Sequence, residues 1–462
     1  MALAGCGGGG ASAPPVTLSS IAISPDPVYI GIGTSLQLAA TGTYSNGTTA
    51  DLTSSVTWTS ANSAVATIAA SGVVNAVGAS GATTTISASL GSVIAPAVTL
   101  TITSAVSVSS NGLNFARYDH TATLLNDGTG RVLVAGGYNN VALASAELYD
   151  PATAKWKTTT LPMGVGRRDH TATLLPSTGN VLLIGGGTAS GDLDSAELYN
   201  PGTDTWVSYP HILTKPRSYH TATLLNPAAN GGRELVLVVG GSLSSTADLY
   251  DPSIAASAVA VTDSSPRYSH TATLLANNSV LVTGGFDTST ASVLATAELF
   301  NPMGTAMQPT ENLITARYLH SATLLQDGRV LVAGGLDAMG NPLVSAELYD
   351  PAAASGSKWT SAGNLTIPRF GHIATLMPNG QVLVMGGRNA SNPTLSSAEL
   401  YTPGAPGTPG TWSPTANLQI GRAVFSATLL NTGPNAGNVL VVGGEGTVNG
   451  NYVVLPDVEL HN

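Results

Sequence analysis

One sequence pattern recurs seven times from residue 117 onward, and it limits the possible folds more than any other feature of the chain. With small variations, each copy reads Arg-x-x-His-Thr-Ala-Thr-Leu-Leu, a turn, Val-Leu-Val-x-Gly-Gly, a variable loop, and Ser-Ala-Glu-Leu-Tyr-Asp-Pro. Self-similarity at a period of 50 to 53 residues indicates a propeller or an array of repeats. The arginines that open the copies are Arg117, Arg167, Arg217, Arg267, Arg317, Arg369 and Arg422.

Within each copy, the runs of residues predict a small sheet of four strands. The first two runs, at 121–125 and 132–135 in the first copy, are apolar on both faces. We expect sheets stacked face to face around an axis to cover such strands, whereas an open antiparallel sheet would leave one face in water. A later run, Lys155-Trp156-Lys157, alternates in polarity and fits a half-exposed outer strand.

The repeat resembles the kelch motif, and the resemblance covers residues 113–462. It implies a seven-bladed kelch-type β-propeller, so the predicted fold class is all-β. The glycine pair of the motif allows positive φ angles and close packing of chains. The pairs are Gly136-Gly137, Gly185-Gly186, Gly240-Gly241, Gly284-Gly285, Gly334-Gly335, Gly386-Gly387 and Gly443-Gly444.

The last copy ends after its third strand, at 459–462, and so needs a fourth strand from elsewhere. The segment 105–110 precedes Arg117 by about the distance at which Trp156 precedes Arg167. We therefore expect this segment to pair with the strand that holds Val458 and Leu460 and to close a propeller domain of residues 104–462. Closure removes sheet edges that would otherwise invite aggregation.

Residues 16–103 form a segment of a different kind. The segment contains no Glu, Lys or Arg and has short Val, Ile and Thr-rich runs separated by turn signals, which predicts a β-sandwich. Alternation in two of the runs points Leu36, Leu38, Val56 and Trp58 inward. The order of the runs is similar to that of bacterial Ig-like group 2 domains, and the resemblance implies a spacer or adhesive module.

The N-terminal residues 1–15 contain the one cysteine of the chain, Cys6, in Leu3-Ala4-Gly5-Cys6, followed by glycines and prolines. This resembles the lipobox of bacterial lipoproteins. The resemblance implies a lipid anchor on Cys6 and a flexible tether, and hence a place in the bacterial cell envelope, as an outer-membrane lipoprotein, or outside the cell. The charged and apolar regions that normally precede a lipobox are not present upstream of it.

Composition excludes two kinds of partner. The net charge is −10, and no Lys or Arg precedes Arg117, so we expect no nucleic-acid partner. No run of 18 apolar residues occurs, so we expect contact with a membrane only through a lipid anchor. The sequence does not predict the oligomeric state.

Two sets of polar residues recur in register with the repeat. Six copies have a histidine at the same position, and every copy has an acid that follows its Arg, by 30 or 31 residues in six copies and by 37 in the last. A ring of imidazoles could ligate a metal, but a group present in every blade is more simply explained as satisfying buried backbone. We therefore expect no metal or cofactor, and we expect each Arg to pair with an acid. The histidines are His120, His170, His220, His270, His320 and His372, with Phe425 in the last copy.

Ligand-binding residues are expected where the copies diverge. The loops before each Arg-x-x-His and after each Gly-Gly share one face of a propeller, and there the chain varies in aromatic and charged residues. Asp119, Tyr219 and Tyr268 lie alongside these loops. The candidates for ligand binding are Tyr138, Arg168, Asp169, Asp192, Phe286, Asp287, Asp337, Arg388 and Glu445.

These observations favour a non-enzymatic binding or adhesion protein that recognises a carbohydrate or a protein. Seven kelch-like blades also resemble the catalytic domain of galactose oxidase, but that copper radical cofactor needs a Cys near the propeller, and Cys6 is the one available. A carbohydrate-active hydrolase stays open because glycosidase acids have no local signature. A structural subunit of a surface assembly is a third alternative. No residue is predicted to be catalytic.

Overall fold

The computed structural model divides into two compact units, Met1–Ala105 and Val106–Asn462. It describes residues 16–24, 28–31, 35–79, 82–103, 106–108, 112–242, 246–254, 257–262, 265–302, 304, 306–448 and 451–461. The predicted lipid-anchor residue Cys6 and the tether lie outside the described residues.

The described part of the first unit is a sandwich of short strands. Its core is formed by the alternate residues of these strands, including Leu38, Val56 and Trp58, which are buried, and Leu36, which packs against them half-buried. The Trp58 indole N–H donates a hydrogen bond of 2.9 Å to the Thr53 carbonyl. The first sheet consists of β1 (Leu18–Ser24), β4 (Ala39–Tyr44) and β5 (Thr49–Asp51). The second consists of β10 (Val93–Ile94), β9 (Thr83–Leu90), β11 (Val98–Thr103) and β2 (Val28–Gly31), and β6 (Thr57–Ser60) also pairs with β9. The third consists of β3 (Ser35–Gln37), β8 (Val73–Ala76) and β7 (Ala66–Ile68).

The second unit contains, among its described residues, seven four-stranded antiparallel sheets, which we call blades 1 to 7. Blade 1 has β13 (Thr121–Leu124), β14 (Val132–Ala135), β17 (Ala146–Asp150) and β18 (Lys155–Thr158). Blade 2 has β19 (Thr171–Leu174), β20 (Val181–Ile184), β23 (Ala196–Asn200) and β24 (Thr205–Tyr209). Blade 3 has β25 (Thr221–Leu224), β26 (Val236–Val239), β27 (Thr246–Tyr250) and β28 (Val259–Thr262). Blade 4 has β29 (Thr271–Leu274), β30 (Val280–Thr283), β33 (Ala297–Phe300) and β34 (Met307–Pro309).

The remaining blades follow the same order. Blade 5 has β35 (Ser321–Leu324), β36 (Val330–Ala333), β37 (Ser345–Tyr349) and β38 (Trp359–Asn364). Blade 6 has β39 (Ile373–Leu376), β40 (Val382–Met385), β41 (Ala398–Thr402) and β42 (Thr411–Pro414). Blade 7 has β44 (Ser426–Leu429), β45 (Val439–Val442), β48 (Val458–His461) and β12 (Val106–Val108).

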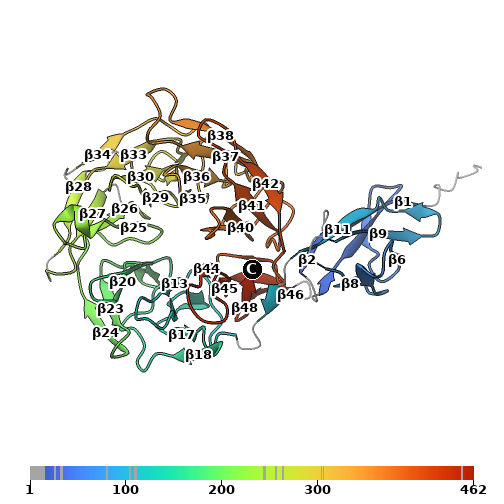
Figure 1. Ribbon diagram of the computed structural model, residues 1–462, viewed down its shortest axis with the longest axis horizontal. Coiled ribbons are helices and arrows are strands. Elements are labelled where there is room, and N and C mark those ends of the chain that lie inside the picture. Colours follow the sequence, from blue (N-terminus) through green and yellow to red (C-terminus); the bar gives the residue numbers. More distant parts are fainter. Residues whose placement is uncertain are drawn as a thin grey trace, which may run out of the picture. The chain divides into compact units, whose positions relative to one another are not determined.

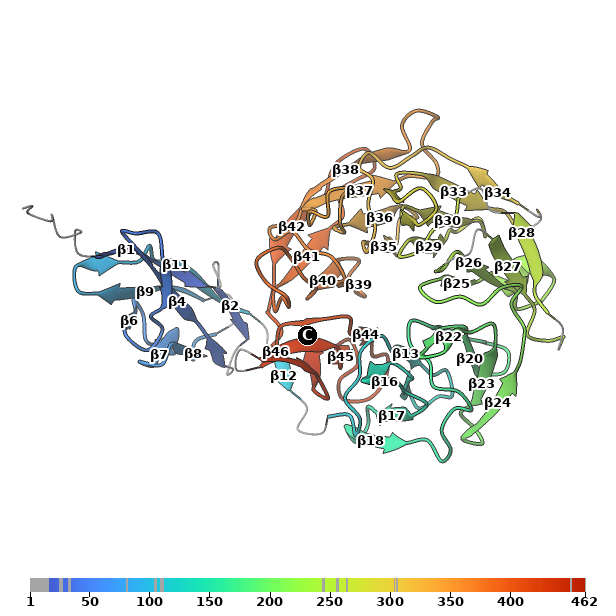
Figure 2. The same cartoon turned by 180° about the vertical axis from the view of Figure 1, so that it is seen from behind.

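The blades form a closed ring around a central axis (Figures 1 and 2). The first strand of each blade lies innermost and contacts the first strand of the next, and β44 of blade 7 contacts β13 of blade 1. Ring closure uses the N-terminal end of the unit, since Val106 pairs with His461 and Val108 with Glu459. The second strands are buried throughout, as in β14. The innermost strands are half-buried instead, because one side borders the axis.

Short additional hairpins follow the glycine pair in several blades. They are β15 (Tyr138–Asn139) with β16 (Val141–Ala142), β21 (Gly187–Thr188) with β22 (Gly191–Asp192), and β31 (Phe286–Asp287) with β32 (Ser292–Val293). In blade 7, β43 (Arg422–Ala423), β46 (Glu445–Val448) and β47 (Asn451–Val454) form a three-stranded sheet. One short 3-10 helix, η1 (Pro227–Asn230), is the only helix that the described residues contain, and none there is long and apolar enough to cross a membrane.

Candidate functional site

Seven buried ion pairs hold the loops that carry the variable residues. In each blade, the Arg that opens the repeat pairs with the acid on the third strand of the same blade, as in Arg167–Glu197 at 3.0 Å. The guanidinium also donates to the carbonyl of the first glycine of the pair, here Gly185, at 2.7 Å. The acid accepts backbone N–H groups from the segment before the Arg, at 2.6 Å from Gly164. The other six pairs are Arg117–Glu147, Arg217–Asp248, Arg267–Glu298, Arg317–Glu347, Arg369–Glu399 and Arg422–Glu459.

The recurring histidines join neighbouring blades. Nε2 of His170 lies 3.0 Å from the hydroxyl of Thr121 in the preceding blade, and the same bond recurs around the ring. Burial, followed by the charge of the nearby Arg117, lowers the pKa of His120 to about 3, so the imidazole is neutral. Each Nε2 is thus engaged by a hydroxyl. The other bonds are His220–Thr171, His270–Thr221, His320–Thr271, His372–Ser321 and His120–Ser426.

Between blades 6 and 7 both partners of this bond are replaced together. Phe425 stands in the histidine position of blade 7, and Ile373 of blade 6 stands where the other blades have a Thr or Ser hydroxyl. The two side chains belong to one apolar cluster. The junction itself is kept by the backbone, since the N–H of Gly387 donates to the Arg422 carbonyl at 2.8 Å, as the second glycine does at every other junction.

The residue just before each histidine lies next to the axis, in a backbone conformation that side chains rarely adopt. Asp119, Asp169 and Tyr219 have φ of 53°, 53° and 55°. The N–H of Asp169 donates to the Asp119 carbonyl, and the N–H of Tyr219 to the Asp169 carbonyl. This arrangement brings residues of equivalent position in adjacent blades side by side. The equivalents in blades 4 to 7 are Ser269, Leu319, Gly371 and Val424, also at positive φ.

Two carboxyl groups meet at this position. The side chains of Asp119 and Asp169 interact directly, and each affects the pKa of the other. Burial, together with the charge of the neighbouring carboxyl group, raises the pKa of Asp119 to about 8, and burial raises that of Asp169 to about 6. The Arg168 guanidinium lies 3.8 Å from Asp169 and stacks 4.6 Å from the centre of the Tyr138 ring.

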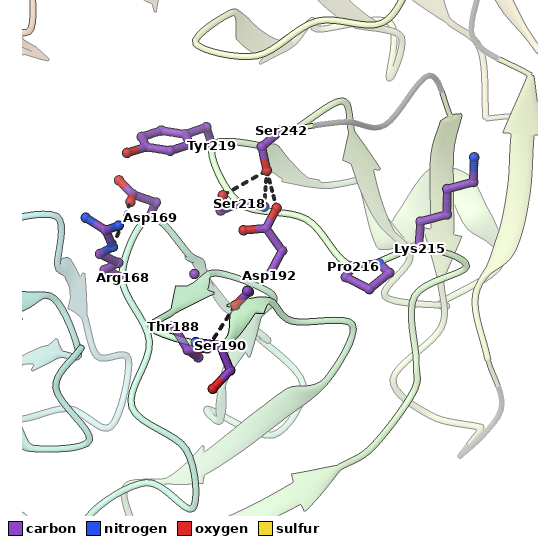
Figure 3. A pocket seen from close by; sticks show the side chains of 12 residues that line it. Arg168, Asp169, Thr188, Ser190, Asp192, Lys215, Pro216, Ser218, Tyr219 and Ser242 are labelled. Atoms are coloured by element: carbon purple, nitrogen blue, oxygen red, sulfur yellow. Dashed lines mark hydrogen bonds and ion pairs between the residues drawn. The ribbon is translucent and has the colours of Figure 1, made fainter. Parts of the chain in front are cut away.

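A pocket of about 710 Å³ opens beside this pair, between blades 2 and 3 (Figure 3). The Tyr219 ring and Asp169 lie at one end of it. Along the wall, the Ser242 hydroxyl donates to Asp192 and lies 3.0 Å from the Ser218 hydroxyl. The remaining lining residues are Arg168, Gly187, Thr188, Ser190, Gly191, Lys215 and Pro216.

Aromatic rings continue from the pocket across blades 3 to 5. The ring centres of Tyr219 and Tyr268 are 6.2 Å apart, those of Tyr268 and Phe286 are 5.6 Å apart, and those of Phe286 and Tyr318 are also 5.6 Å apart. Tyr219 is 42% exposed and the other three are half-buried. We call these four residues the aromatic series. Tyr118 and Tyr138 form a separate pair in blade 1, with centres 5.5 Å apart.

A second charged group lies across blades 6 and 7. Arg388 donates to the Glu445 carboxylate and, at 2.8 Å, to the Tyr452 hydroxyl. Burial and then the hydrogen bond to Glu445 raise the pKa of Tyr452. The charges of Arg388 and Glu445 therefore form an ion pair with each other.

Seven of the nine predicted candidates fall into three places. Arg168, Asp169 and Asp192 line the pocket, with Tyr138 against Arg168; Phe286 belongs to the aromatic series; and Arg388 and Glu445 pair with each other. Asp287 and Asp337 instead accept hydrogen bonds from their own turns, from the N–H of Ser289 and of Met339 at 2.8 Å.

Sequence reasoning did not include Ser218, Ser242, Lys215 or Tyr452 among the candidates. The first two occupy the same repeat positions as Tyr118 and Tyr138, directly after the Arg and after the glycine pair. Repeat position was therefore the signal that could have found them.

Comparison with known proteins agrees with this architecture. Residues 17–113 match the bacterial Ig-like domain (group 2), and residues 116–159 match the Kelch motif. The chain carries both domain types. The predicted all-β fold class, an Ig-like sandwich followed by a kelch propeller, is confirmed.

Two solved structures are similar to the chain. A fungal alcohol oxidase of the AA5 family, in complex with copper, has a TM-score of 0.58 and 17% identity over 78% of this chain and 75% of its own. A structure described as that of YjhT has a TM-score of 0.49 and 15% identity over 65% of this chain and 99% of its own. At these identities the oxidase shows the fold alone. Among the described residues, no group of three His, Cys, Asp or Glu side chains that could hold a metal ion occurs.

One curated relative matches a short stretch. Ice-binding protein 1 of Shewanella frigidimarina is 56% identical over 45 residues, which is 10% of this chain. The matched stretch spans only 5% of the length of that protein.

Proposed function

We propose that the chain is a non-enzymatic binding protein of a bacterial cell surface, and that its kelch propeller recognises a carbohydrate through one face. This face, which we call the variable face, is formed by the loops before each Arg-x-x-His and after each Gly-Gly. The Ig-like domain would serve as a spacer that displays the propeller. The observation that carries the proposal is the aromatic series, which leads out of a polar pocket on that face. Exposed aromatic rings beside hydroxyl, carboxylate and guanidinium groups offer both an apolar surface and hydrogen bonds to a sugar.

Binding and hydrolysis differ in what they require of the carboxyl groups. In glycosidases the two carboxyl groups are about 5 Å apart when configuration is retained and farther apart when it is inverted. The Asp119 and Asp169 carboxyl groups act directly on each other, since the charge of Asp169 raises the pKa of Asp119. We assign this pair to holding a hydroxyl group of the ligand.

The ice-binding relative supports a binding role in general. Its match covers too little of either protein to name the ligand of this chain. The side chains of the variable face are what indicate a carbohydrate ligand.

Anchoring through Cys6 is part of the same proposal. Its support is the motif Leu3-Ala4-Gly5-Cys6 with the glycines that follow. Expression in a bacterium behind a lipoprotein signal sequence, followed by mass spectrometry of the N-terminal peptide, should find a diacylglycerol on Cys6 and none in a Cys6→Ser variant.

Binding can be tested on an array of soluble and immobilised glycans with the full chain. We expect binding to a subset of glycans that is lost on the substitution Tyr268→Ala, because this ring lies within the aromatic series. Tyr44→Ala, which removes a half-buried ring from the Ig-like domain, should leave binding unchanged. If no glycan binds and a captured protein binds in a way that depends on Tyr268, the ligand is a protein rather than a carbohydrate.

A further inference from the structure

The variable face is chemically divided. The Arg–carboxylate pairs of this face, Arg388–Glu445 and Arg168–Asp169, lie on blades 6, 7 and 2, whereas the aromatic series lies on blades 3 to 5. Tyr219 belongs to both parts, since it lines the pocket and its ring is the first of the aromatic series. The face therefore has a direction, with a pocket at one end and a run of rings leading away from it.

The pocket presents polar groups to one bound unit. Asp169 and Tyr219 lie side by side at one end, and Asp192 with Ser242 lies along the wall (Figure 3). Hydroxyl and carboxyl groups at several points around a hollow suit a compact molecule with several hydroxyl groups. The aromatic ring at the same end can cover an apolar face of that molecule.

Beyond Tyr219, the aromatic series consists of the rings of Tyr268, Phe286 and Tyr318. Adjacent rings are tilted by 56° to 58° in the two pairs that include Phe286. A ligand that fits within the pocket would leave these three half-buried rings without a contact. These rings extend the surface available to a ligand beyond the pocket, from blade 3 toward blade 5.

The charges of this face oppose an anionic ligand. Arg168 is engaged by Asp169 and Tyr138, and Arg388 by Glu445 and Tyr452. Lys215 lines the pocket, but its amino group points away from Asp169 and Tyr219 (Figure 3). A carboxylated or sulfated sugar at this end of the pocket would lie beside Asp169 and Asp192, whose negative charges repel it.

We propose that the variable face binds a linear chain of neutral sugars, with one unit held in the pocket between blades 2 and 3 and the following units on Tyr268, Phe286 and Tyr318. This inference rests on the proposed function and specifies its ligand. A chain engages the pocket and the rings at once, so its affinity exceeds that of a single sugar. An acidic chain is rejected by the carboxylates of the pocket.

The test measures affinity against chain length by calorimetry with the full protein. The probes are gluco-, manno- and galacto-oligosaccharides with α and β linkages, from the monosaccharide to the hexasaccharide, with hexagalacturonic acid as the charged comparison. We expect at least one neutral series to bind with affinity that rises over successive units. Hexagalacturonic acid should bind more weakly than the neutral hexasaccharide of the same linkage type.

Two variants locate the subsites. Tyr318→Ala should weaken the hexasaccharide roughly five-fold, about the contribution of one ring, and leave the disaccharide unchanged. Tyr219→Ala should weaken both. Tyr452 is exposed and lies outside the aromatic series. The substitution Tyr452→Phe, which keeps the ring, should weaken binding of neither oligosaccharide.

The outcomes separate this inference from the proposed function. Binding that does not change with chain length, or that changes equally for both probes in Tyr318→Ala, would overturn the extended site and leave carbohydrate binding in place. Tighter binding of hexagalacturonic acid would overturn the preference for neutral sugars. Failure of every oligosaccharide to bind, here and on the glycan array, would overturn both.

Discussion

The imidazole of His170 in blade 2 lies 3.0 Å from the hydroxyl of Thr121 in blade 1, and this bond is exchanged for an apolar contact at one junction only. There, Phe425 and Ile373 replace both partners at once. The joint replacement indicates that the two side chains pack against each other as a pair. A hydroxyl facing Phe, or an imidazole facing Ile, would leave a polar atom without its partner inside the ring.

The first prediction concerns this pair. His170→Phe or Thr121→Ile alone should each destabilise the propeller by about 1 to 3 kcal/mol, because each leaves one polar group unpaired. The double variant His170→Phe with Thr121→Ile should cost less than the sum by at least about 1 kcal/mol. Urea denaturation of the four proteins measures the difference. Strictly additive costs would show that the two positions are independent.

The second prediction concerns stability in mild acid. In the unfolded chain a histidine takes up a proton near pH 6.5, whereas burial keeps the pKa of His120, His220 and His372 at about 3 in the folded state. Each buried histidine therefore lowers stability as the pH falls below about 6.5, by about 1.4 kcal/mol per pH unit.

Comparison of variants isolates this effect. The double variant His170→Phe with Thr121→Ile removes one of these groups, so its stability should fall less steeply between about pH 6 and 5, by the equivalent of one proton. His211→Ala should not reduce the slope, because this exposed side chain pairs with Asp194, which raises its pKa. Denaturation midpoints across this pH range provide the measurement; parallel curves for all three proteins would contradict the prediction.

The repeat made much of the fold predictable from the sequence. A run such as Val132–Ala135 is buried on both faces only if a sheet packs against each, and the Arg and acid recur in register, so their pairing could be expected. The strand that closes blade 7 could be placed because the last copy lacked one, and the structure has Val106–Val108 there. In each case the information lies in spacing along the chain.

The candidate site was less predictable because its contacts cross between blades. Asp192 and Ser242 meet although they are 50 residues apart, and neither has a distinctive local motif. Asp287 and Asp337 lie in the loops that follow the glycine pair, one residue after the position of Tyr138, yet short polar neighbours draw their carboxylates into turns. The inner strands are half-buried because the axis leaves one side open, which an apolar pattern alone does not reveal.

The third prediction concerns the buried ion pairs. Glu197→Gln should destabilise the propeller by about 3 to 5 kcal/mol, because it leaves the fully buried Arg167 charge without a counter-charge. Lys157→Ala breaks a surface ion pair with Asp204, where the lysine is 70% exposed, and should cost less than about 1 kcal/mol. Thermal denaturation of both variants at neutral pH makes the comparison. Equal costs would mean that the recurring Arg contributes no more than a surface charge.

The fourth prediction concerns the proton shared by Asp119 and Asp169. Their pKa values in the folded state are raised above the unfolded value near 3.9, so folding retains a proton that the unfolded chain has lost, and stability should decline as the pH rises through about 6 to 8. Asp119→Asn keeps a hydrogen-bond donor and removes one charge, so its decline should be shallower by about 1.4 kcal/mol per pH unit. Asp127→Asn, at a carboxylate whose pKa is lowered by its hydrogen bonds to Thr129 and Arg131, should follow the unmodified protein. Melting temperatures measured from pH 6 to pH 9 decide the matter, and an Asp119→Asn curve parallel to the unmodified one would mean that no proton is shared.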